Sequence, residues 1–129
     1  FSIVSKDDRL GGSPWTLALF TQVNFPVAAH EGYARVDYQY GAALNDLTPG
    51  QNPANGGSNT IFNVPANAYT SARAGVKFGN LDVSLFAQNL LNTQPKLSQQ
   101  LSGVPGASPL YQVYTWRPRT IGVTAVYRY

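Results

Sequence analysis

Apolar and polar side chains alternate along five stretches of this chain. In the first, residues 16–26, Leu17, Leu19, Val23 and Phe25 share one parity. The same alternation recurs over residues 33–44, 68–78, 81–91 and 118–129, although Phe86 interrupts it. Successive side chains of a β-strand point to opposite faces, so a period of two predicts strands with one apolar and one polar face. The sequence therefore predicts an all-β chain of about five long strands.

The connections between these stretches alternate between short and long. Gly79-Asn80 is a candidate two-residue hairpin turn, and the interval 28–32 is also short and turn-like. Residues 45–67 are rich in Gly, Asn and Pro, and residues 92–117 are interrupted by Pro95, Pro105 and Pro109, which predicts two long loops. Because a short turn can join only antiparallel neighbours, we expect an antiparallel up-and-down meander.

The length of the stretches favours a transmembrane β-barrel. Each has roughly the length of a tilted membrane strand, about 9–11 residues, and exceeds the about 5–6 residues of an ordinary strand. No window reaches the about 18 apolar residues of a membrane helix. Bacterial outer-membrane barrels have short periplasmic turns and long outer loops. This pattern predicts that loops 45–67 and 92–117 face the external medium.

Six charged residues of these stretches fall on the polar parity. The six that carry this interpretation are Arg35, Asp37, Arg73, Lys77, Asp82 and Arg128. A Lys or Arg facing lipid at the bilayer midplane costs about 2–4 kcal/mol, so we expect these six to face the lumen. There they would form a cross-strand network or contact another part of the parent protein, rather than bind substrate. A soluble sheet with one buried face would show the same segregation.

Aromatic residues gather at the ends of the stretches. Trp15 and Trp116 precede two of them, at the expected outer side of the membrane. At the opposite ends lie Phe25, Tyr33, Phe78, Tyr127 and Tyr129. Two aromatic girdles around small aliphatic residues are typical of membrane barrels, although aromatics also favour strands in general.

Two motifs near the C-terminus extend this interpretation. Residues 117–129 begin Arg-Pro-Arg-Thr and continue as alternating apolar residues to a terminal tyrosine, and residues 85–92 are Leu-Phe-Ala-Gln-Asn-Leu-Leu-Asn. They resemble the last two strands of TonB-dependent outer-membrane receptors, whose penultimate strand ends in Asn-Leu-aromatic-Asp. Leu91 and Asn92 depart from the final pair of that motif. The resemblance covers residues 13–129, and its middle part is generic barrel pattern.

The resemblance implies that residues 1–129 are the C-terminal portion of a receptor barrel in the bacterial outer membrane. Such receptors take up a siderophore, cobalamin or a glycan, and TonB drives them through a plug domain. The expected partners are outer-membrane lipid, the remainder of the barrel and the plug, and the barrel-assembly machinery that recognises the terminal aromatics Tyr127 and Tyr129. The plug and most of the about 22 strands are absent here, so we expect residue 1 to lie inside a longer protein.

Candidate ligand-binding residues lie in the expected outer loops. They are amide, aromatic and cationic side chains that suit sugars or peptide-like chelates: Gln51, Asn52, Phe62, Lys96, Tyr111, Tyr114 and Arg117. The same mixture is ordinary in a solvated loop. The sequence does not identify the transported nutrient.

Other functional classes find little support. The net charge of +3 is scattered, so we expect no nucleic-acid partner. Cysteine is absent, His30 is the only histidine, and we find neither a nucleophile elbow nor metal-ligand spacing. We therefore predict no enzyme activity, no cofactor and no metal. The alternatives are a soluble β-sandwich binding module and an outer-membrane barrel without TonB coupling.

Overall fold

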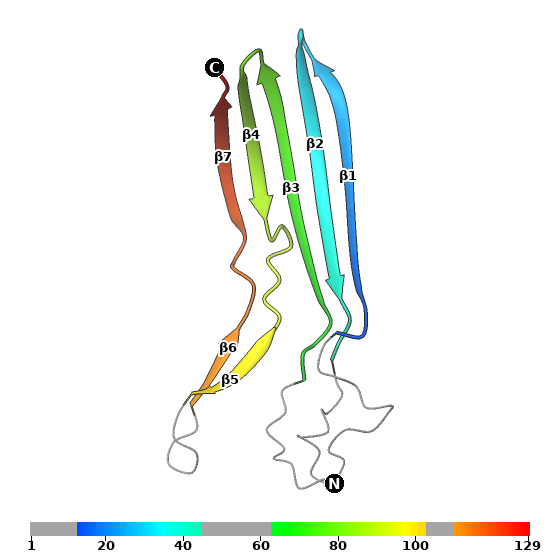
Figure 1. Ribbon diagram of the computed structural model, residues 1–129, viewed down its shortest axis with the longest axis vertical. Helices are drawn as coiled ribbons and strands as arrows, with labels where there is room; N and C mark the ends of the chain where they lie inside the picture. The colour runs from blue at the N-terminus through cyan, green and yellow to red at the C-terminus, as the bar shows by residue number, and fades with distance from the viewer. Residues whose placement is uncertain (1–12, 45–62, 103–109) are drawn as a thin grey trace, which may run out of the picture. The chain divides into compact units, whose positions relative to one another are not determined.

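The computed structural model describes residues 13–44, 63–102 and 110–129, and all regular structure in these ranges is β. Five strands form one sheet in the order β1-β2-β3-β4-β7, with neighbouring strands running in opposite directions (Figure 1). Their bounds are β1 Thr16–Val27, β2 His30–Gly41, β3 Asn67–Phe78, β4 Leu81–Gln88 and β7 Thr120–Tyr127. The predicted all-β antiparallel meander of five strands is confirmed. The sheet is open, and β1 and β7 form its edges.

The described residues divide into two compact units. The first comprises Leu17–Tyr40, Ala68–Gln94 and Trp116–Tyr129, and it holds nearly all of the five-stranded sheet. The second contains a separate two-stranded sheet of β5 (Ser98–Ser102) and β6 (Leu110–Tyr114). No helix in the described ranges is long and apolar enough to cross a bilayer.

The two hairpin turns of the large sheet are both short. Phe78 pairs directly with Leu81, so Gly79-Asn80 forms the predicted two-residue turn, with a φ of 59° at Gly79. The turn between β1 and β2 is tighter than expected and consists of Ala28 and Ala29. Ala28 takes a φ of 54°, a value that suits a two-residue hairpin. For this reason β2 begins at residue 30 rather than at the predicted 33.

Strands β4 and β7 are shorter than the alternation predicted. Strand β4 ends at Gln88 because the next residue, Asn89, has a φ of 50°, which no strand residue adopts. Strand β7 begins at Thr120. Arg119, which has the parity of the apolar side chains, therefore precedes the strand instead of lying within it.

The predicted loops are only partly irregular. Interval 92–117 contains the β5-β6 hairpin, in which Ser98 pairs with Tyr114 and Ser102 with Leu110. In the other interval, residues 45–62 lie outside the described ranges. Leu44 and Val64 form an isolated antiparallel bridge with N–O distances of 2.9 and 3.1 Å.

The five-stranded sheet has almost no core. Among the side chains that the structure describes, Ala42 is the one buried apolar residue, and Ser84 and Asn89 are the buried polar ones. Folded domains of this size ordinarily bury a continuous cluster of Leu, Ile, Val and Phe. Backbone ladders and cross-strand pairs therefore hold this sheet together, without the help of a buried second face.

Candidate functional site

One face of the sheet is an apolar surface that runs without interruption across β3, β4 and β7. The register places residues of one parity opposite one another, and directly opposed residues share a face. The resulting rows are Ala72–Ala87–Ile121, Ala74–Leu85–Val123, Val76–Val83–Ala125 and Phe78–Leu81–Tyr127. We call this surface the apolar face; none of its twelve members is charged.

The apolar face is largely uncovered. Leu85 is 55% exposed, Ile121 63% and Val123 69%. Full burial of such a side chain stabilises a protein by about 1.5–3 kcal/mol, so a row of them left in water is unfavourable. A contiguous exposed apolar patch marks a contact with another protein or with a membrane.

The opposite face carries the charges. The register rows are Arg73–Phe86–Gly122, Gly75–Ser84–Thr124 and Lys77–Asp82–Val126. Arg73, Lys77 and Asp82 therefore lie on the side away from the apolar face, and we call this side the polar face. Arg128 follows β7, and its backbone N donates to the carbonyl of Asn80 at 2.9 Å.

Near the short turns, the polar face is held by side-chain contacts between strands. Lys77 Nζ lies 3.1 Å from Glu31 Oε1, which joins β3 to β2. Tyr33 Oη donates to Asp82 Oδ1 at 3.1 Å and so reaches from β2 across β3 to β4. The expected cross-strand network thus consists of separate pairs, and Glu31 and Tyr33, which the charge pattern missed, complete two of them.

The third pair lies within a single strand. Arg35 Nε donates to both carboxylate oxygens of Asp37 at 3.0 Å, and Arg35 Nη2 lies 2.6 Å from Asp37 Oδ1. Residues two apart in a strand point to the same face, which permits this bidentate contact. The Arg35 guanidinium carbon also lies 4.8 Å from the centroid of the Phe20 ring on β1, within the range of a cation–π contact.

At two glycines of the polar face, the missing side chain leaves room for an aromatic ring from the neighbouring strand. A Cβ at Gly122 would lie 2.6 Å from the Phe86 ring, and a Cβ at Gly75 would lie 2.7 Å from Tyr33 Oη. Any larger residue would displace these rings. The position of Phe86 at a polar parity, which alternation alone does not explain, is therefore accounted for by its partner Gly122.

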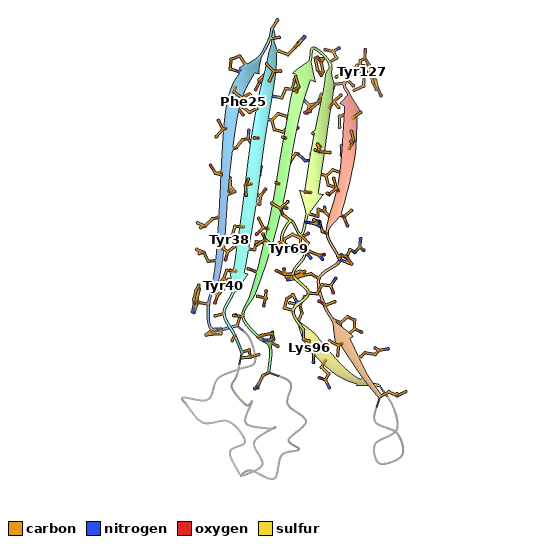
Figure 2. All side chains as sticks on the ribbon, turned by 180° about the vertical axis from the view of Figure 1, so that it is seen from behind. Phe25, Tyr38, Tyr40, Tyr69, Lys96 and Tyr127 are labelled. Carbon is orange, nitrogen blue, oxygen red and sulfur yellow. The ribbon has the colours of Figure 1, made fainter. Side chains whose placement is uncertain are left out.

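Aromatic residues lie near both ends of the sheet (Figure 2). Phe25 and Tyr127 lie at the end of the short turns, and Tyr38, Tyr40 and Tyr69 lie towards the other end. Tyr33, which was predicted to belong to one aromatic girdle, lies on the polar face instead and makes no part of that girdle. Trp116 packs against Tyr69, with ring centroids 5.0 Å apart, and Tyr69 shares the strand parity of Arg73.

A buried polar cluster ends β4. Asn89 is 1% exposed, and its Nδ2 donates to the carbonyls of Thr93 at 2.8 Å and Arg117 at 2.7 Å. Its Oδ1 accepts from Thr93 N at 3.0 Å. One side chain therefore joins the end of β4 to the segment that leads into β7.

The same cluster also reaches β3. Thr93 Oγ1 donates to the carbonyl of Ala68 at 2.9 Å, and Asn92 Oδ1 accepts from Arg119 N at 2.9 Å. Asn92 has a φ of 52°, close to that of Asn89. In the sequence, both asparagines stand out only as part of the motif at residues 85–92. Their spacing after a strand is a usable signal, because Asn adopts left-handed backbone conformations more readily than most residues.

The predicted ligand-binding residues do not form a described site. Gln51, Asn52 and Phe62 lie outside the described ranges, and so does the side chain of Tyr111 in β6. The remaining three, together with the terminal aromatics, are exposed: Lys96, Tyr114, Arg117, Tyr127 and Tyr129. In the second unit, Tyr114 Oη lies 3.4 Å from Gln112 Oε1.

No protein-family model, curated protein sequence or solved structure matches this chain. Across the described ranges, no group of three or more His, Asp or Glu residues could hold a metal ion. The resemblance to TonB-dependent receptors therefore depends on the sequence motifs, and the functional argument depends on the two faces of the sheet.

Proposed function

We propose that this chain forms part of the wall of an outer-membrane β-barrel, with the apolar face against lipid and the polar face against the aqueous lumen. The observation that carries this proposal is the apolar face itself. Its rows continue in register through three strands and are exposed at Leu85, Ile121 and Val123. The charges of these strands lie on the other side.

The distribution of residue types along the apolar face supports lipid as its covering. The three rows from Ala72 to Val76 contain only Ala, Val, Leu and Ile, and the row at the turn end contains Phe78 and Tyr127. Aliphatic residues at mid-height with aromatics near an interface are typical of membrane barrels. The core of a soluble sandwich has no reason to order its residues by height.

The polar face suits an aqueous wall. Its ion pairs are partly exposed, with side-chain exposures of 43% and 34% for Arg35 and Asp37 and of 45% and 53% for Lys77 and Glu31. Ionised side chains retain much of their hydration at such exposures. A water-filled or plug-filled lumen would provide that hydration.

Within this class, we propose the C-terminal part of a TonB-dependent receptor for a scarce nutrient such as a siderophore, cobalamin or a glycan. This finer assignment is supported by the motifs at residues 85–92 and 117–129. The open edges at β1 and β7 are consistent with a partial wall, because the unpaired N–H and C=O groups of an edge strand can pair with further strands. Transport would then belong to the complete receptor.

Fluorescence quenching by lipid tests the proposal at two adjacent residues. The chain has no cysteine, so Val123→Cys and Thr124→Cys each create a single labelling position. These neighbours lie at the same height of β7 but on opposite faces. After refolding into phosphatidylcholine vesicles, a fluorophore at 123 should be quenched by nitroxides on the acyl chains, and one at 124 by a water-soluble quencher.

Equal quenching at the two positions would contradict the proposal. So would a monodisperse chain in detergent-free buffer whose label at 123 is shielded from both quenchers, since a soluble β-sandwich has that property. The TonB assignment has a separate test. The coding sequence upstream of Phe1 should encode a plug domain, and a barrel without TonB coupling would lack it.

A further inference from the structure

Arg73 differs from Arg35 and Lys77, the other cations of strands β2 and β3 on the polar face, because no carboxylate holds it. Arg35 is paired with Asp37 and Lys77 with Glu31. Within the described ranges, the Arg73 side chain has no ion pair and no hydrogen bond. Its one electrostatic contact there is a cation–π contact with Phe86, whose ring centroid lies 6.0 Å from the guanidinium carbon. Its five N–H donors are thus available to a ligand.

Arg73 lines a concavity of about 350 Å³ on the polar face. The side chains that give it chemical character are Arg35, Asp37, Ser71, Arg73, Phe86 and Gln88. We call it the Arg73 concavity. Its volume lies at the lower end of the about 300–1,000 Å³ range of small-molecule sites.

The charges of the Arg73 concavity favour a monoanion. Two arginines and one aspartate give a net charge of +1, and the carboxylate of Asp37 is already occupied by Arg35. A single free guanidinium matches a carboxylate, which it can bind through two parallel hydrogen bonds. A phosphate dianion is disfavoured, because Asp37 would repel its second charge.

The neutral residues add specificity. Ser71 and Gln88 contribute a hydroxyl and an amide, both able to donate to an oxyanion. Phe86 contributes a ring that is fixed between Arg73 and Gly122. A ligand that carries a carboxylate next to an apolar or aromatic group would satisfy both kinds of surface.

We propose that the Arg73 concavity is a binding site for the carboxylate group of a small organic acid, with Arg73 as its anchor and Phe86 as the packing surface. This inference goes beyond the proposed function. It requires only that the polar face meets water, which holds for a barrel lumen and for a soluble sheet alike.

A titration with benzoate tests the site, because benzoate combines a carboxylate with a ring. The complete chain is refolded in a zwitterionic detergent, ionic strength is held constant with NaCl, and the side-chain amide signals of Gln88 are followed by NMR. These signals should shift saturably. Arg73→Gln should raise the apparent Kd at least about tenfold, because it removes a charge-assisted bidentate contact.

Arg119→Gln is the matched control. It removes the same charge from an exposed residue that does not line the Arg73 concavity, and it should leave the Kd of benzoate unchanged. Backbone amide shifts of β4 and β7 report whether each variant retains the sheet. If Arg73→Gln loses the sheet, Arg73→Lys replaces it, and the loss of the planar fork should still weaken binding about threefold.

Three results would overturn the proposal. They are a shift of Gln88 that does not saturate or that NaCl reproduces, an equal loss of affinity in the Arg73 and Arg119 variants, and full affinity in a folded Arg73→Gln or Arg73→Lys variant. None of these results bears on whether lipid covers the apolar face, since the lipid quenching experiment tests that separately.

Discussion

The two faces of the sheet are organised in different ways. Residues of the apolar face, such as Leu85 and Val123, are directly opposed but meet no second layer and stay exposed. Residues of the polar face meet a particular partner, as Tyr33 meets Asp82 and Phe86 meets Gly122. The apolar face therefore contacts whatever surrounds the sheet, and the specific contacts of the polar face determine which residues of neighbouring strands lie side by side.

This difference has a physical origin. Apolar contact is non-directional, so any residue of suitable size and hydrophobicity serves on a lipid-facing surface. Hydrogen bonds and ring-over-glycine contacts are directional and are lost when a strand slips. A slip of one residue would also exchange the two faces, so the partners on the polar face and the proposed lipid contact of the apolar face would both specify the same register.

The largest expected effect comes from a charge on the apolar face. Leu85→Arg should destabilise the chain refolded in vesicles by about 2–4 kcal/mol, because a guanidinium at mid-height would face acyl chains. The cost of a lipid-facing charge depends on its depth in the bilayer. Leu85 lies in the second of the four rows, between Ala74 and Val123. The free energy of unfolding is measured by denaturant titration.

Thr124→Arg is the comparison on the polar face. The residue is half-buried in β7, next to the row that contains Leu85 and Val123, and its side chain points to the other side. We expect a clearly smaller loss of stability than at Leu85. Equal losses would mean that both faces have the same surroundings, which would remove the reason for assigning lipid to one of them.

The next effect concerns the polar cluster at the end of β4. Asn89→Ala should destabilise the sheet by about 2–3 kcal/mol, since it leaves buried partners in Thr93 and Arg117 unsatisfied and places alanine at a φ of 50°. Amide hydrogen exchange at Thr93 N should accelerate. Asn89→Asp keeps the acceptor and loses the donor, so it should preserve the protection of Thr93 N better than Asn89→Ala does.

The sequence allowed much of the large sheet to be predicted. Parity alone placed Arg73, Lys77 and Asp82 on one face, and the Gly79-Asn80 turn followed from the turn preference of its two residues. Both features depend on local rules, namely the pleat of a strand and the φ of a glycine. Such rules need no knowledge of the rest of the chain.

What could not be predicted depends on contacts between distant residues. Nothing near Tyr33 indicates that it reaches Asp82, 49 positions later. Nor does the sequence indicate that Lys77 has a carboxylate partner while Arg73 has none among the described residues. The early end of β4 is a similar case, since Asn89 leaves the strand to bind the carbonyl of Arg117, 28 positions away. The pairing of β5 with β6 was also not predicted, because the three prolines of interval 92–117 indicated a loop without regular structure.

A moderate effect is expected where an aromatic ring lies over glycine. Gly122→Ala should cost about 1–2 kcal/mol, since its Cβ would lie 2.6 Å from the Phe86 ring and the ring must shift. Phe86→Leu should relieve that clash, so the two substitutions together should destabilise less than the sum of their separate effects. Additive losses in this double-mutant cycle would show that the ring does not occupy the space above Gly122.

The smallest expected loss of stability comes from breaking an ion pair of the polar face, and it should be smaller than the loss from a packed contact such as Phe86 over Gly122. Lys77 and Glu31 are about half exposed, so Glu31→Gln should cost only about 0.2–1 kcal/mol, and added salt should reduce the difference. Denaturant titrations at low and high salt measure both quantities. If the loss instead equalled that of Gly122→Ala and did not respond to salt, the pair would be shielded from water, and the polar face would require a covering of its own.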